Sequence, residues 1–176
     1  MEKKQKILFT ALKLFATEGV AATSTKKIAL EAGVSEGLIF KHFISKSSLL
    51  ADILTMADEK CRALFIGVFQ EEDPIRVIQK VIEVPFNVPV TDYHFWRLEL
   101  ILKWQENFND PEKTRPIKEK LRRAFYELNY EDPEMEAGFI YQTMEATISE
   151  ILKGNVKNLD TLKWFLTKKY GPQKSA

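Results

Sequence analysis

Apolar residues recur at intervals of three and four along most of this chain, the spacing that places them on one face of an α-helix. Such stretches cover residues 3–18, a long segment from Ser45 to about residue 70, and then 75–84, 112–129, 133–153 and 159–169. Residues 92–108 are apolar nearly all round, which predicts a buried central helix. Pro85 and Pro89 predict a loop between two of these helices. No stretch alternates with the period of a strand, so the sequence predicts an all-α protein of about nine helices.

The stretch from residue 24 to 46 contains two short helical patterns joined by a glycine turn. Ser24 or Thr25 can cap the first pattern, and Ser35 can cap the second. Gly33 lies where the chain turns sharply, and glycine tolerates the positive φ angle that such a turn requires. This order is typical of a helix-turn-helix, whose second helix can enter a DNA major groove. An ordinary pair of antiparallel helices is the alternative interpretation.

Charge is distributed unevenly in a way that favours a nucleic-acid partner. The chain has 176 residues, 45% of them hydrophobic and 29% charged, and its net charge is only +1. Residues 1–50 nevertheless contain eight lysines and four glutamates, whereas the remainder is acidic. A basic segment on an acidic body is what a local DNA-binding surface requires.

Composition also argues against several other classes of protein. The single cysteine cannot form an internal disulfide, the N-terminus does not resemble a signal peptide, and no apolar run approaches the ~20 residues of a membrane helix. We therefore expect a cytoplasmic protein without a membrane partner. The two histidines and the cysteine lie in unrelated segments, and no phosphate loop or metal-ligand spacing occurs. The sequence thus predicts neither an enzyme, nor a cofactor, nor a metal site.

One run of residues is similar to the N-terminal signature of the TetR family of transcriptional repressors, in detail over about residues 6–50. The run is Ala11-x-x-Leu14-Phe15-x-x-x-Gly19, Thr23-Ser24, Ile28-Ala29, Ala32-Gly33-Val34-Ser35, Gly37-x-x-Phe40-x-His42-Phe43, Lys46 and Leu49. The resemblance implies a three-helix DNA-binding domain over residues 1–46 and a helical ligand-binding and dimerisation domain over 47–176. It also implies a homodimer, formed through the last two helices, that reads a near-palindromic operator.

The resemblance assigns DNA contacts residue by residue. Backbone phosphates would be met by Ser24, Thr25, Lys26, His42 and Lys46. The recognition helix would face DNA with Ser35, Glu36, Gly37, Leu38 and Lys41.

Phe40 departs from the family pattern, in which this position is usually tyrosine. Its ring lacks the hydroxyl that would bind a phosphate, so it either touches a thymine methyl group or a sugar, or packs inward. Residues 1–50 contain no arginine, so this segment cannot read guanine in the bidentate manner of arginine. Glu36 and Lys41 are the polar candidates for reading bases.

The sequence predicts the residues of the ligand site less specifically than the DNA contacts. Its candidate residues are mostly apolar or aromatic, which favours a small apolar or aromatic effector; they are Cys61, Phe65, Phe69, Phe86, Phe95, Trp96, Leu100, Trp104, Tyr141 and Met144. His94 is interpreted as a surface or loop histidine. The resemblance implies a repressor released from its operator by this effector. A ligand-independent regulator of the same fold, or a scaffold protein with a vestigial helix-turn-helix, is the alternative.

Overall fold

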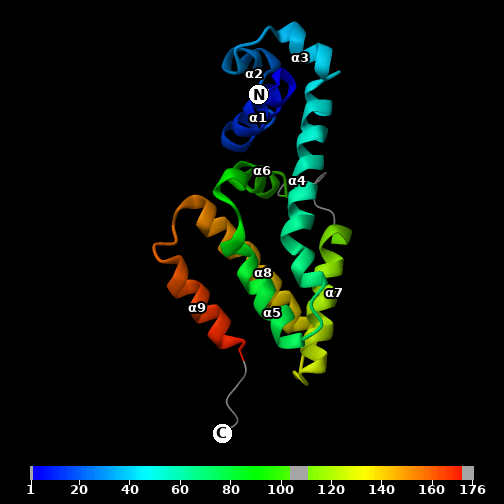
Figure 1. The fold of residues 1–176 in the computed structure, drawn as a ribbon, viewed down its shortest axis with the longest axis vertical. Coiled ribbons are helices and arrows are strands. Elements are labelled where there is room, and N and C mark those ends of the chain that lie inside the picture. The colour runs from blue at the N-terminus through cyan, green and yellow to red at the C-terminus, as the bar shows by residue number, and fades with distance from the viewer. Residues whose placement is uncertain (1, 104–110, 172–176) are drawn as a thin grey trace. The chain divides into compact units, whose positions relative to one another are not determined.

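The computed structural model describes residues 2–103 and 111–171, and the regular structure in these ranges is entirely helical (Figure 1). The all-α class is confirmed. The elements are α1 (Lys3–Glu18), α2 (Thr25–Ala32), α3 (Glu36–His42), α4 (Lys46–Phe69), α5 (Pro74–Glu83), the 3₁₀ turns η1 (Val84–Asn87) and η2 (Val90–Asp92), α6 (Tyr93–Lys103), α7 (Pro111–Glu127), α8 (Pro133–Lys153) and α9 (Leu159–Lys169).

The chain divides into two compact units. The first unit comprises residues 1–61 and 90–109, and the second comprises 62–89 and 110–176. Helix α4 therefore contributes its first part to one unit and its last turns to the other. Across the described ranges, no helix combines the length and the apolar character that crossing a membrane requires.

The first unit is built around a continuous apolar core. Helices α2, α3 and α6 each contact α1, and α4 contributes buried side chains to the same cluster. Its fully buried members include Ile7, Phe15, Ile28, Ile39, Leu49 and Leu98. Because each of these helices supplies at least one such residue, the helix-turn-helix has no independent core and depends on α1, α4 and α6 for its shape.

The second unit is a helical bundle in which α8 packs on α7 and α5. Its apolar stripe recurs at helical spacing, with Ile140, Met144 and Ile148 buried on α8. Phe125 of α7 lies at the centre of an aromatic cluster, with its ring 4.9 Å from that of Tyr130 and 6.2 Å from that of Tyr170. These edge-on contacts join the end of α7 to the residue that follows α9.

Two expectations about the middle of the chain were wrong in detail. The segment predicted as a proline loop forms the 3₁₀ turns η1 and η2, since proline fixes a φ angle that a tight helical turn also uses. Helix α6 is not buried all round: Phe95, Leu98 and Leu102 are buried, whereas Ile101 is 37% exposed. Residues 104–108, which the sequence places in the same helix, lie outside the described residues.

His94 also differs from expectation, because it belongs to α6 and is half-buried. Burial, together with the positive charges of Arg97 and Lys13, lowers the pKa of this imidazole below its usual value. His94 is therefore neutral near pH 7. In the part of the chain that the structure describes, its buried Nδ1 has no hydrogen-bond partner.

Candidate nucleic-acid interface

Serine side chains cap three consecutive helices at the N-terminal end of the chain. The backbone N–H of Lys27 donates to the Ser24 hydroxyl at 3.1 Å, and the N–H of Leu38 donates to the Ser35 hydroxyl at 3.3 Å. At the start of α4, the N–H of Ser48 donates to the Ser45 hydroxyl at 3.1 Å, which satisfies one of the free donors of a helix start. The sequence prediction of these caps is confirmed, with Ser24 rather than Thr25 capping α2.

The turn between α2 and α3 is made by Gly33 in the left-handed conformation, with φ 63° and ψ 41°. The N–H of Gly33 donates to the carbonyl of Leu30, and that of Val34 donates to the carbonyl of Ala29 at 3.0 Å. These bonds close the end of α2 and turn the chain directly into α3. Ala29 and Ala32 are buried beside the turn, where small side chains let the two helices approach closely.

Helix α3 presents one face to the core and the opposite face to solvent. Ile39 and Phe43 point inward and are 0% and 3% exposed. At 100° per residue, the position opposite these two residues is that of Lys41, with Gly37 about 40° and Phe40 about 100° from it around the helix. All three residues are exposed, so this is the surface with which α3 can meet a partner.

Two residues with different predicted roles in DNA binding are bonded to each other. The Thr25 hydroxyl at the start of α2 donates to Glu36 Oε1 at the start of α3, at a distance of 2.5 Å. This bond ties the two helix starts together. It also occupies the Thr25 donor, which the sequence assigns to a phosphate, and one oxygen of Glu36, which the sequence assigns to a base.

Lys46 has a structural role that the sequence did not reveal. Its ammonium group donates to the carbonyl of Val20 at 2.8 Å and to that of Thr23 at 3.0 Å. The buried Thr23 hydroxyl in turn donates to the carbonyl of Gly19 at 2.9 Å. Lys46 thus holds the α1–α2 loop against the start of α4, and the two bonds use two of the three N–H donors of its ammonium group.

The remaining predicted DNA contacts lie mostly on the surface of the first unit. Ser24, Lys26 and Ser35 are exposed, while Leu38 and His42 are half-buried. The His42 ring stands 6.3 Å from that of Phe43. The exposed lysines and the outward face of α3 therefore belong to one compact unit.

The predicted ligand residues are divided between the two units. Cys61, Phe95, Trp96 and Leu100 belong to the first unit, and Phe65, Phe69, Phe86, Tyr141 and Met144 belong to the second. Trp104 lies outside the described residues. Phe65, Phe95, Tyr141 and Met144 are buried, which fits core packing as well as ligand contact, whereas Phe69 is 44% exposed.

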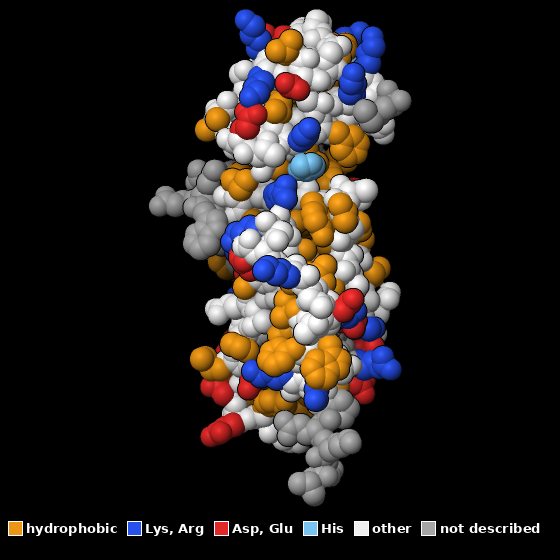
Figure 2. All heavy atoms as spheres, turned by 90° about the vertical axis from the view of Figure 1, so that its left-hand side faces the viewer, with side chains coloured by type: hydrophobic (Ala, Val, Ile, Leu, Met, Phe, Trp, Pro, Cys, Tyr) orange, Lys and Arg blue, Asp and Glu red, His pale blue; other side chains and the backbone are white. Residues whose placement is uncertain are grey.

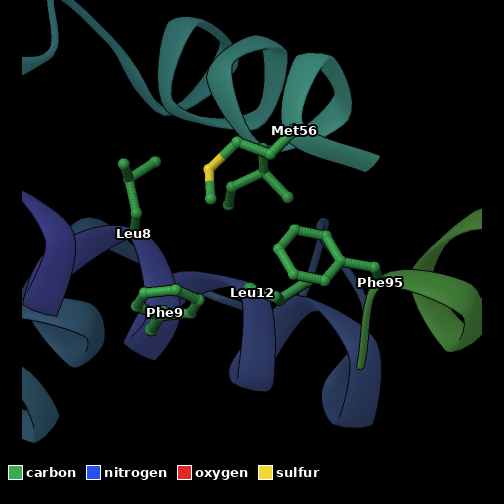
Figure 3. Close-up of a pocket in the computed structure, with 6 residues that line it drawn as sticks. Leu8, Phe9, Leu12, Met56 and Phe95 are labelled. Atoms are coloured by element: carbon green, nitrogen blue, oxygen red, sulfur yellow. The ribbon is translucent and has the colours of Figure 1, made fainter. Parts of the chain in front are cut away.

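Within the first unit, α1, α4 and α6 surround a narrow apolar hollow (Figure 3). It is too narrow to hold a water molecule, and it is lined by Leu8, Phe9, Leu12, Ile53, Met56 and Phe95. Phe95 is the one predicted ligand residue in this lining. Among the described residues, no group of three His, Cys, Asp or Glu side chains is placed to hold a metal ion.

Comparison with known proteins agrees with this geometry. Residues 7–53 match the family model described as bacterial regulatory proteins, tetR family. The uncharacterized HTH-type transcriptional regulator YerO of Bacillus subtilis is 30% identical over 139 residues, which cover 74% of this chain and 43% of YerO. The chain spans less than half the length of the first curated relatives that it matches.

Solved structures share the fold over nearly the whole chain. A TetR-like transcriptional regulator from Rhodococcus sp. RHA1 has a TM-score of 0.79 at 18% identity, covering 96% of this chain and 93% of that one. AibR, in complex with isovaleryl coenzyme A and operator DNA, has a TM-score of 0.70 at 16% identity, covering 96% and 97%. The capped helices and glycine turn thus define a helix-turn-helix protein of all-α fold. By the match over residues 7–53, the N-terminal part of the chain belongs to the TetR family.

Gly33 provides a test of the turn. Gly33→Ala should lower the free energy of unfolding by about 1–2 kcal/mol, because a Cβ disfavours the left-handed conformation. Gly67→Ala is the matched control: this glycine is helical, and an added Cβ meets nothing within 4 Å. Urea denaturation of both variants should show a loss for the first and none for the second. If the two substitutions changed the free energy of unfolding equally, the left-handed conformation at Gly33 would not be what makes alanine unfavourable there.

Lys46 provides a test of the loop clamp. Lys46→Ala should lower the free energy of unfolding by about 1–3 kcal/mol, because the partly buried carbonyls of Val20 and Thr23 lose a charged hydrogen-bond donor. Lys41→Ala, at an exposed position on α3, should leave stability unchanged. Thermal and urea unfolding of the two variants measure the difference. If Lys46→Ala is as stable as the parent, its hydrogen bonds do not hold the loop.

Proposed function

We propose that this chain is a dimeric, sequence-specific DNA-binding transcriptional regulator that acts as a repressor. The observation that carries the proposal is the outward face of α3, which is held by a capped helix-turn-helix and has exposed lysines close to it in the chain. A recognition helix must present a few unpaired side chains to the groove while its opposite face is fixed by packing. Membership of its N-terminal part in the TetR family supports the same function.

Residues 1–46 would bind DNA and residues 47–176 would carry dimerisation and ligand binding. Ser24, Lys26, His42 and Lys46 would contact phosphates, which position the protein without reading sequence. Thr25 would reach a phosphate only by releasing Glu36, so in the unbound protein this pair fixes the orientation of the two helix starts. The face of α3 would then read the bases.

Exposed aromatic side chains on α8 and α9 support a dimer. None of the residues of α9 is buried, and Trp164 and Phe165 are 61% and 55% exposed. Phe139 of α8 is 51% exposed, with the Lys169 ammonium 5.6 Å from its ring centre. Figure 2 shows hydrophobic side chains gathered on the face that α9 presents. Exposed aromatic groups of this size favour burial against a second copy.

Ligand control would act as a population shift, in which an effector favours a conformation that no longer fits the operator. The AibR structure holds both an acyl coenzyme A and operator DNA, which supports such coupling in a protein of this fold. An apolar or aromatic effector suits the predicted ligand residues. The narrowness of the hollow in Figure 3 favours, as a second candidate, a regulator of the same fold that needs no ligand.

DNA binding can be tested with duplexes selected from a random pool. The protein should enrich a near-palindromic sequence, and Lys26→Ala should weaken binding to every duplex. Each lost phosphate contact should reduce the slope of log K against log salt by about 0.9. Lys157→Ala removes an equal charge from an exposed position outside the helix-turn-helix and should leave the slope unchanged. Failure to enrich any sequence would refute the proposed function.

Dimerisation can be tested by sedimentation velocity at micromolar concentration. The parent protein should sediment as a dimer, and Trp164→Glu should weaken the dimer by about 30-fold or more, as expected for an aromatic residue at the centre of an interface. Tyr126→Glu is the control, because Tyr126 is 68% exposed on α7. A parent protein that sediments as a monomer, or equal weakening by both variants, would contradict an interface at α9.

A further inference from the structure

We infer that this regulator recognises thymine methyl groups through the exposed ring of Phe40. The inference rests on the proposed DNA-binding function and adds the chemical feature of the operator that the recognition helix reads. The sequence left open whether Phe40 packs inward. In the structure it is 50% exposed, while the neighbouring Ile39 is 0% exposed.

Hydrogen-bond acceptors are missing from the centre of the outward face of α3, as the structure describes it. The carboxylate of Glu36 lies at the edge of the face and accepts from the Thr25 hydroxyl at 2.5 Å. The Ser35 hydroxyl accepts from the backbone N–H of Leu38. Adenine and cytosine present amino groups in the major groove, and reading them requires a free acceptor. This face is therefore poorly suited to them.

Two chemical groups do point outward from this face. Lys41 is exposed and offers an ammonium group, which suits the acceptors of guanine. Phe40 offers an apolar ring and, having no hydroxyl, cannot donate a hydrogen bond to a phosphate. The thymine C5-methyl group is the apolar feature that a base presents in the major groove, and it is the base contact that matches a phenyl ring.

Gly37 gives the ring access to that methyl group. A Cβ added at Gly37 would meet nothing within 4 Å, so packing within the chain does not require glycine here. Glycine also weakens a helix relative to alanine. Around the helix axis, Gly37 lies between Phe40 and Lys41. Because Gly37 has no side chain, a base edge can approach the backbone of α3 closely there. The apolar ring and the open backbone beside it therefore form one reading surface.

The test replaces single thymines by deoxyuridine, which removes the methyl group and leaves base pairing intact. A duplex selected by the protein from a random pool is synthesised with one thymine of each half-site replaced at a time. Affinity should fall about four-fold for each methyl group lost from the contact with Phe40, the value for burial of one such group. Phe40→Ala should bind more weakly overall and should be insensitive to the same replacement.

Val90→Ala is the matched control, because Val90 is 75% exposed in the first unit but lies outside the helix-turn-helix. It should retain the full sensitivity to deoxyuridine, and thermal unfolding checks that each variant is folded. The inference is overturned if every deoxyuridine duplex binds as tightly as the thymine duplex, as a sugar contact predicts. It is also overturned if the half-site lacks thymine, or if Phe40→Ala keeps the sensitivity. The second outcome would assign the methyl group to another apolar residue, such as Ile44, which follows α3 and is 91% exposed. Failure to select any sequence refutes the proposed function itself.

Discussion

The crossing of α2 and α3 is the constraint on which the DNA-binding surface depends. Two short helices can meet this closely only because the chain reverses at Gly33 with a positive φ angle and because small residues lie at the contact. The crossing directs Ile39 into the core, and the helical repeat then fixes which residues of α3 point away from it. A different turn would rotate α3 and present another set of side chains.

Some polar groups around this crossing hold the structure together, and others are left available to a partner. The Thr25 hydroxyl donates to one carboxylate oxygen of Glu36, and Lys46 donates to two carbonyls of the α1–α2 loop. Such contacts hold the helix starts in place, which would limit the conformational entropy lost on the proposed binding of DNA. What remains on α3 is a cation, an aromatic ring and a bare glycine. This limited set is the basis of the proposed contact between Phe40 and thymine methyl groups.

In the second unit, some apolar side chains are buried between helices and others are exposed to solvent. Helices α5, α7 and α8 bury their stripes against one another, whereas α9 places Trp164 and Phe165 in solvent. Large aromatic groups left exposed in a folded chain are costly to solvate and favour association. Helix α9 packs on α5, and its exposed Trp164 and Phe165 are the side chains that the proposed dimer would bury.

The sequence by itself determined the helices, their caps and the glycine turn, because these depend on residues within a few positions of one another. It therefore placed α8 and α9 at their observed bounds and identified the helix-turn-helix. Only the tertiary structure decided which polar residues are free. Lys46 reaches carbonyls more than twenty residues away, and Thr25 reaches Glu36 across the turn, contacts that no local pattern encodes. The exposure of Phe40 was decided in the same way, since the core accepts Ile39 and leaves the neighbouring ring outside.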